Sequence, residues 1–344
     1  MSSISQKRIT IQGIADALNV SHTTVRKALN GQPGISEKRR KVIKAAAEQM
    51  GYVPNLLARS LKQNKSTFIG VVITKSLREI WYASLVDCLI AELKAKGYSV
   101  LLSLTDRTHP DEVRQTLQGF LGGHVAGVIA GPLSRQAYLE QFDCVVSAGI
   151  PLVVFENVEG APAHCVSIDH CKGVKLAIEY LVEMGHRDIG YLCGDQFAFP
   201  NTRRYGYEQA LFENDLPVLG KNFIPGESTF AGGYQAIITR WESAPNDFPD
   251  AIFCHSDISA LGAMKAFREI GIRVPEDISL VGYDDIPEAS YGAPALTTIG
   301  GALGKMAASI SNMVCQTIEG ELSISQSDLI EPELIVRDSV IRLK

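Results

Sequence analysis

The feature that most constrains the fold of this chain is the stretch at residues 10–30, TIQGIADALNVSHTTVRKALN. Apolar side chains recur there at helical spacing in two short runs, and only three residues separate the runs. Thr10 and Ser21 are typical N-cap residues, and Asn30-Gly31 is a typical helix end. Because so short a joint makes two helices cross steeply, the stretch predicts a helix-turn-helix.

The second helix of this motif has a polar face that begins with His22 and Thr23. Hydroxyl, imidazole, amide and cationic side chains hydrogen-bond to phosphates and to base edges in a major groove. If the motif reads DNA, the contacts we expect come from Thr10, Ser21, His22, Thr23, Thr24, Arg26, Lys27 and Asn30. Two ordinary core helices of a small bundle would have the same apolar spacing, so the helical pattern leaves both interpretations open.

The distribution of charge favours the DNA-binding interpretation. Residues 1–65 contain 12 Lys and Arg against 3 Asp and Glu, a net charge of +9. The whole chain contains 33 against 38, so the remaining residues carry a net charge of −14. A basic head on an acidic body is typical of a nucleic-acid-binding protein, and a bundle helix has no need of it.

A third helix and a distinctive segment follow the motif. Ser36 precedes a helical pattern at residues 37–50, which Gly51 ends, and residues 52–62 read YVPNLLARSLK. At this point the sequence resembles the LacI/GalR family of bacterial transcription regulators. The resemblance continues in the GHRDI run at residues 185–189, in GYDD, and in ALTTI at residues 295–299, so it covers nearly the full length. His186 and Arg187 of the first run also suit a scaffold role at a helix end.

The resemblance implies a hinge helix after the third helix. In the family this segment lies in the minor groove beside its twofold mate, where a leucine matching Leu61 wedges into a base step. The DNA contacts implied here are Asn55, Ala58, Arg59, Leu61 and Lys62. A packing leucine in a plain linker helix is the alternative for Leu61.

The body of the chain has the pattern of parallel βα units. A length of 344 residues suggests two or three domains. Short β-rich runs alternate with helical stretches, the clearest helix lying at residues 81–96. Strands are expected at residues 68–73, 100–104, 127–130, 152–155, 189–193, 251–253 and 280–283. Two successive series of this kind imply two similar subdomains that face each other.

We therefore expect a small all-α helix-turn-helix head and an α/β core of two doubly wound parallel-sheet subdomains. The resemblance implies that this core is periplasmic-binding-protein-like, and that the chain crosses between subdomains near residues 296–299 and 328–336. The expected divisions are a DNA-binding domain at 1–52, a hinge and linker at 53–66, and a core at 67–344, with an N-subdomain at about 67–168 and 298–326 and a C-subdomain at about 169–297 and 327–344.

A sensing site is expected where the strands of the core end. Ligands bind beyond the carboxyl ends of parallel strands, and those ends carry Thr74, Lys75, Glu156, Asp195, Ser256, Asp257 and Asp284. The resemblance adds the aromatic pair Trp81 and Tyr82 and the cation Arg203, and it supports Glu156, Ser256 and Asp284 as effector contacts. The expected effector site is thus Thr74, Lys75, Trp81, Tyr82, Glu156, Arg203, Ser256, Asp257 and Asp284.

The chemistry of this set narrows the effector only to a class. An arginine opposite a carboxylate suits hydroxyls or an anionic group, and flat aromatic faces suit a sugar ring or a base. Ser256 stands where sugar-sensing members usually have Asn, and Glu156 replaces a more usual Asp. The effector is therefore a sugar, a sugar acid or a related metabolite. Trp81 and Tyr82 could instead simply pack, and Lys75 and Arg78 could be solvated surface charges.

Enzymes and exported proteins fit the sequence poorly. The chain has no G-x-G-x-x-G, G-x-S-x-G or Walker motif and no His/Cys cluster with metal-ligand spacing, so we expect no catalytic residues, no cofactor and no metal. Its seven cysteines are scattered without a C-x-x-C pair, which indicates buried thiols. No apolar run approaches the ~20 residues of a membrane span, and the first ten residues are polar, so we expect a cytoplasmic protein. A solute-binding protein would need an export signal and no basic head.

Together these features predict a homodimeric transcription regulator, in most respects typical of a repressor. Its expected partners are a pseudo-palindromic double-stranded DNA operator and a small-molecule effector. Whether the effector induces or co-represses stays open at this point.

Overall fold

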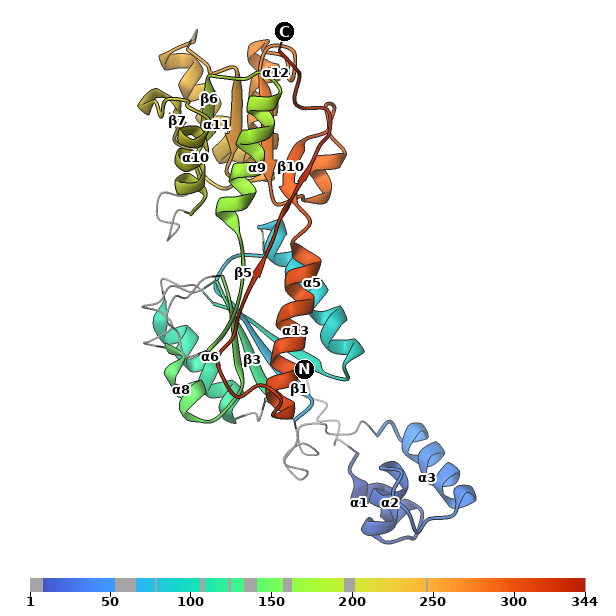
Figure 1. Ribbon diagram of the computed structural model, residues 1–344. Helices are drawn as coiled ribbons and strands as arrows, with labels where there is room; N and C mark the ends of the chain where they lie inside the picture. Colours follow the sequence, from blue (N-terminus) through green and yellow to red (C-terminus); the bar gives the residue numbers. More distant parts are fainter. Residues whose placement is uncertain are drawn as a thin grey trace. The chain divides into compact units, whose positions relative to one another are not determined.

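The computed structural model describes residues 9–52, 66–77, 79–105, 109–122, 125–132, 141–156, 163–194, 202–245 and 247–343. The chain forms two compact units, Met1–Lys65 and Ser66–Lys344, which we call the head unit and the core unit. Figure 1 draws the head unit in blue and the core unit in cyan to red. The expected hinge contacts Asn55, Ala58, Arg59, Leu61 and Lys62 lie outside the described residues.

The head unit contains the helix-turn-helix that the sequence predicts. Its helices are α1 (Ile11–Ala17), α2 (His22–Leu29) and α3 (Glu37–Gln49). The Thr10 hydroxyl accepts from the Gly13 amide, and the Ser21 hydroxyl accepts from the Thr24 amide, each at 3.1 Å. Ser36 occupies the N-cap position of α3, but its side chain makes no capping bond. The three helices bury one apolar cluster, formed by Ile14, Ala15, Val25, Ala28, Ile43 and Ala47.

The first subdomain of the core unit is a parallel sheet with helices on both faces. Its strand order is β11-β5-β4-β3-β1-β2. The strands are β1 (Phe68–Ile73), β2 (Ser99–Leu104), β3 (Gly127–Gly131), β4 (Leu152–Phe155), β5 (His164–Ile168) and β11 (Ser327–Ile330). Alternate residues of β1 point to opposite faces: Ile69, Val71 and Ile73 pack with α5 (Ile80–Ala95) and α13 (Leu303–Glu319). Val72 packs on the other face, with α6 (Pro110–Gly122) and α8 (Asp143–Ser147).

The second subdomain repeats this plan in the order β12-β10-β9-β8-β6-β7. Its strands are β6 (Ile189–Leu192), β7 (Phe223–Ile224), β8 (Ala251–Cys254), β9 (Ser279–Tyr283), β10 (Thr297–Gly300) and β12 (Glu333–Ile335), and only β12 runs antiparallel to its neighbour. Helices α9 (His170–Glu183) and α10 (Thr202–Glu213) share one buried cluster with the sheet. The other cluster includes α11 (Phe230–Ser243) and α12 (Asp257–Ile270). Two short 3-10 helices, η1 (Gly220–Asn222) and η2 (Pro287–Ser290), complete this subdomain.

The chain passes between the two subdomains three times. It crosses at Asp169 between β5 and α9, at residues 301–302 between β10 and α13, and at residues 331–332 between β11 and β12. Figure 1 shows β5 leading into α9, and the red C-terminal segment running from one sheet to the other. The Asp169 amide donates to the Ile330 carbonyl at 2.9 Å, so the first and third crossings lie side by side.

Sheet membership corrects the expected subdomain bounds at two places. Residues 298–300 belong to β10 of the second sheet, although we expected them in the first subdomain. Residues 327–330 form β11 and pair with β5 of the first sheet, although we expected them in the second. The crossings are so short that a strand's membership depends on which neighbour it hydrogen-bonds to, and local pattern carries no information about that.

Several sequence features serve the scaffold. His186 is buried, with one ring nitrogen 3.3 Å from Asp250 and the other 3.1 Å from the Ile341 carbonyl oxygen, as a scaffold role requires. All seven cysteines are free thiols, and Cys165, Cys254 and Cys315 are buried. Among the described residues, no helix has the length and hydropathy needed to cross a membrane.

Candidate functional site

The polar face of α2 leaves its first two residues uncommitted. His22 and Thr23 are exposed, and within the described residues their side chains make no hydrogen bond. By contrast, the hydroxyls of Ser21 and Thr24 lie 2.8 Å apart as part of the helix cap. Arg26 and Lys27 are half-buried, whereas Thr10 and Asn30 are exposed at the helix ends. His22 and Thr23 are therefore the side chains of α2 that are freest to contact another molecule.

A second set of cations lines α3. Lys38, Arg39, Lys41 and Lys44 are exposed. Arg40 is instead committed to the head unit, because it donates to the Gln32 carbonyl at 2.9 Å and lies 3.5 Å from Glu37. The exposed cations give the head unit a basic surface that suits an anionic polymer.

In the core unit, three acidic residues at strand ends have left-handed backbone angles. Glu156 follows β4 with φ of 62°, and Asp284 and Asp285 follow β9 with φ of 115° and 54°. Residues other than glycine adopt such angles only where the surrounding structure holds them, and such positions gather at functional sites. The strand ends that the sequence singled out are thus also where backbone strain is concentrated.

Glu156 is joined to the second subdomain through a histidine. Its Oε2 lies 3.0 Å from Nε2 of His170, the first residue of α9. The other ring nitrogen of His170 lies 2.8 Å from the hydroxyl of Tyr283 on β9. The sequence analysis missed both residues. Tyr283 adjoins Asp284 in the GYDD motif, whereas β5, which delivers His170, was not expected as a strand.

Arg203 is held on three sides in the second subdomain. Its guanidinium carbon lies 3.8 Å from the centroid of the Tyr283 ring, and its Nη2 lies 3.3 Å from Oδ1 of Asp284. Its Nη1 donates to the carbonyl of His255. Stacking, ion pairing and a carbonyl contact together orient a planar guanidinium fully. The side chains of Arg203 and Asp284 are only 15% and 14% exposed, so the pair lies largely out of bulk water.

The charges of the site follow from burial and these contacts. Burial raises the pKa of Asp284 to about 6, against the opposing effect of Arg203. Burial also acts to raise the pKa of Glu156, but His170 and Arg203 outweigh it and the pKa ends below its ordinary value. Burial, followed by the charge of Arg203, holds the pKa of the His255 imidazole well below its usual range. At neutral pH the site therefore presents two carboxylates, one guanidinium and a neutral His255.

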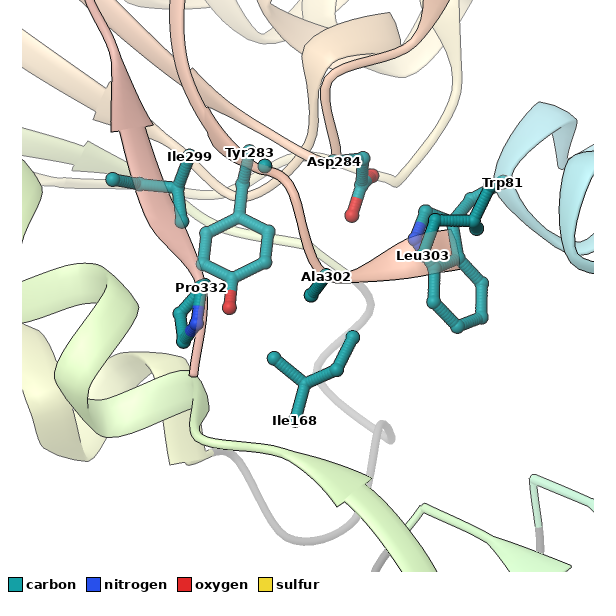
Figure 2. A pocket seen from close by; sticks show the side chains of 9 residues that line it. Trp81, Ile168, Tyr283, Asp284, Ile299, Ala302, Leu303 and Pro332 are labelled. Atoms are coloured by element: carbon teal, nitrogen blue, oxygen red, sulfur yellow. The ribbon is translucent and has the colours of Figure 1, made fainter. Parts of the chain in front are cut away.

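A pocket adjoins this network, with about 210 Å³ of empty space. Its lining comes from both subdomains and from all three crossings: Trp81, Ile168, Tyr283, Asp284, Ile299, Gly300, Ala302, Leu303 and Pro332. Figure 2 shows the Asp284 carboxylate pointing into the space between the Tyr283 and Trp81 rings. Trp81 meets Tyr82 edge-on at 5.0 Å between ring centroids. Burial raises the pKa of Tyr82 well above its ordinary value, and Glu156 is the next cause, so this phenol stays neutral.

Four of the expected effector residues are engaged elsewhere. Asp257 is fully buried and accepts from the Ile286 amide at 3.0 Å and from the Thr298 hydroxyl. Ser256 caps α12. Thr74 is buried and donates to the Pro132 carbonyl, and Lys75 pairs with Glu79 at 3.4 Å.

The other five expected residues, Trp81, Tyr82, Glu156, Arg203 and Asp284, converge on the network and pocket. Asp195 and Arg78 lie outside the described residues. Asp285 turns away from Asp284 and pairs with Arg337 at 2.6 Å, so the two carboxylates diverge as expected. No group of three or more His, Cys, Asp or Glu residues in the described ranges could hold a metal ion.

Known proteins resemble this chain over almost its whole length. Residues 10–55 match the lacI family of bacterial regulatory proteins, and residues 178–340 match the periplasmic binding protein-like domain. The HTH-type transcriptional repressor PurR of Haemophilus influenzae is 32% identical over 340 residues, which cover 96% of this chain and 98% of that protein.

Two solved structures are similar throughout. The lac repressor dimer bound to operator and the anti-inducer ONPF is 27% identical, with a TM-score of 0.86 over 97% of this chain and 100% of the matched chain. A complex of the transcriptional regulator CelR with cellobiose is 28% identical, with a TM-score of 0.71 over 96% and 100%. The expected fold, a helix-turn-helix head with a periplasmic-binding-protein-like core, is confirmed.

Proposed function

Because the chain belongs to the LacI family of bacterial regulatory proteins, we propose that it is a repressor that binds an operator as a homodimer under the control of a small-molecule effector. The observation that carries this proposal is the exposed pair His22 and Thr23 on the first turn of α2, in a head unit that is strongly basic. The similarity to a lac repressor dimer on its operator supports the same arrangement.

The DNA contacts divide into two kinds. First-turn side chains of a recognition helix reach base edges, so His22 and Thr23 read the sequence of the operator. Exposed cations of α3, such as Lys38 and Lys41, contact phosphates and set affinity rather than preference. A twofold dimer places two such units on a pseudo-palindrome. The hinge residues around Leu61 bind the minor groove between the half-sites.

The effector binds beside the polar network of the core unit. Arg203, Asp284 and Glu156 offer a donor fork and two acceptors to hydroxyl groups, and Trp81 and Tyr82 offer flat apolar faces. This chemistry fits a sugar, a sugar acid or a related metabolite, and the similarity to a cellobiose complex supports a sugar. Control follows from a difference in effector affinity between two arrangements of the subdomains.

We assign no catalytic role, no cofactor and no metal to this chain. Asp284 and Asp285 face different arginines, so they do not form an acid/base pair. The protein acts in the cytoplasm, where its operator is.

A fragment selection tests the DNA-binding half of the proposal. Full-length protein is mixed with sheared genomic DNA at low salt, and bound fragments are recovered and sequenced. We expect a pseudo-palindromic motif, and an affinity whose logarithm falls with log salt at about −0.9 per neutralised phosphate. Absence of affinity for any fragment at low salt would refute it.

A ligand screen tests the sensing half. Sugars, sugar acids and purines are added singly to the full-length protein, and the shift in its melting temperature is measured. Arg203→Ala should abolish the shift produced by any hit, because the effector group facing it loses its partner. Arg204→Ala is the matched control: this neighbour on α10 is half-exposed and pairs with Glu208 on the surface. Undiminished ligand binding in Arg203→Ala would move the site elsewhere.

A further inference from the structure

The groups that face the effector site are paired with one another across the two subdomains. Glu156 belongs to the first subdomain, and Tyr283, Arg203 and Asp284 belong to the second. His170 is the residue that joins the two sets, through contacts of 3.0 Å to Glu156 and 2.8 Å to Tyr283. Each of these polar groups therefore has a protein partner when no effector is bound.

The backbone holds His170 firmly at this position. It follows Asp169, the first crossing, whose side chain caps α9 by accepting from the Lys172 amide at 2.9 Å. One helical turn later, Gly173 leaves room for the Tyr283 hydroxyl, because a Cβ at that position would lie 2.8 Å from it. The side chains of His170 and Glu156 are 14% and 21% exposed, so water competes little for their hydrogen bond.

The direction of the two hydrogen bonds follows from the chemistry of the partners. The pKa of Glu156 lies below its ordinary value, so its carboxylate can only accept, and Nε2–H of His170 donates to it. In the neutral ring, Nδ1 then accepts from the Tyr283 hydroxyl. A single imidazole thus uses both nitrogens, one toward each subdomain.

We propose that His170 is a positioning residue that latches the two subdomains together at the crossing. It fixes the Glu156 carboxylate on one side and, through Tyr283, the ring on which Arg203 is stacked. An effector hydroxyl that takes Glu156 competes with His170 and releases the latch. That last step rests on the proposed function, whereas the latch itself is a property of the core unit.

Hydrogen exchange on the full-length protein, without DNA or effector, tests the latch. The reporters are the Glu156 amide, which donates to Val166 at 3.0 Å, and the Asp284 amide, which donates to Ile299 at 2.8 Å. His170→Leu fills the space but cannot hydrogen-bond, so exchange at both strand ends should rise about tenfold, the effect of one lost buried hydrogen bond. His170→Gln keeps one donor and one acceptor and should restore most of the protection.

The matched control is Lys172→Ala. Lys172 lies two residues along α9 and pairs with Glu331 at 2.7 Å, but both side chains are well exposed, so its loss should leave the reporters unchanged. Equal protection in the Leu and Gln variants would show that His170 merely packs. A rise confined to α9 would overturn the proposal in the same way.

Tyr283→Phe removes only a hydroxyl and keeps the result decisive if His170→Leu folds poorly. It should raise exchange at the Glu156 amide, in the other subdomain. Combined with His170→Leu it should add nothing further, because both changes break one linkage. Additive effects would refute the latch. Since no DNA or effector is present, neither outcome bears on operator binding, which the fragment selection decides separately.

Discussion

Replacing Asp284 with asparagine removes a buried carboxylate and keeps the shape of the side chain. Burial, opposed by Arg203, raises the pKa of Asp284 from 3.8 to about 6 in the folded protein. The folded state therefore holds this proton more tightly than the unfolded state does. The stability contributed by Asp284 is fully present below pH 3.8 and is lost as the pH rises through 6.

The size of the effect follows from those two values. A shift from 3.8 to about 6 corresponds to about 3 kcal/mol in all, of which roughly 1 kcal/mol is already lost at pH 4.5. Between pH 4.5 and 7.5 the wild type should thus lose up to about 2 kcal/mol through this group. The 14% exposure of the side chain lets water screen the charge, so this value is a ceiling. Asparagine does not titrate, so Asp284→Asn should gain stability relative to wild type by that amount across the window.

Urea denaturation followed by circular dichroism, repeated from pH 4.5 to 7.5, measures this difference. Asp277→Asn is the control, because hydrogen bonds from the Arg273 side chain and amide lower the pKa of Asp277 to about 2. Its stabilising contribution is present above pH 3.8 and is lost only as the pH falls toward 2, so it should be constant in the window. Parallel pH curves for wild type and Asp284→Asn, or a divergence of the opposite sign, would refute the reasoning.

Three further predictions concern the head unit and the hinge. His22→Ala should change the sequence selected from a random DNA pool, whereas Lys41→Ala should keep that sequence and lower the salt slope by about 0.9; an unchanged selection in His22→Ala would contradict the proposed docking. Gly13→Ala should stabilise the head unit by about 1 kcal/mol, because the new Cβ meets only the Thr10 hydroxyl at 3.8 Å, and slower amide exchange in α1 checks this while faster exchange contradicts it. Leu61→Ala should weaken specific DNA binding much more than non-specific binding, since it removes the wedge that offsets base-step unstacking; equal losses in titrations on operator and random DNA would make the segment a plain tether.

Local chemistry was enough to locate most of the secondary structure. The N-caps at Thr10 and Ser21 and the glycine after α2 mark the helix-turn-helix, since caps depend on residues within one turn. The run FIGVVI of β1 is apolar throughout because both faces of a parallel strand are covered. Such patterns survive in any tertiary context, so a sequence read by itself reveals them.

Strand β5 shows where local pattern fails. Its sequence, HCVSI, includes His164 and Ser167 and resembles no apolar run, yet four of its five residues are buried. That burial arises because β4 and β11 pair with it on both sides, and β11 lies more than 150 residues away in the chain. Missing β5 also concealed the crossing at Asp169, and with it the position of His170.

The candidate site was likewise only half visible in the sequence. Motifs located Arg203 and Asp284 individually, but they could not show that Asp257 faces the protein interior while the neighbouring His255 carbonyl orients the arginine. The contacts that define the network join residues 14, 81 and 113 positions apart. Side-chain types and strand ends follow from neighbours along the chain and are written in the sequence. Which of those ends meet is decided only when two sheets and three crossings are assembled, because contacts over such separations exist only in the folded state.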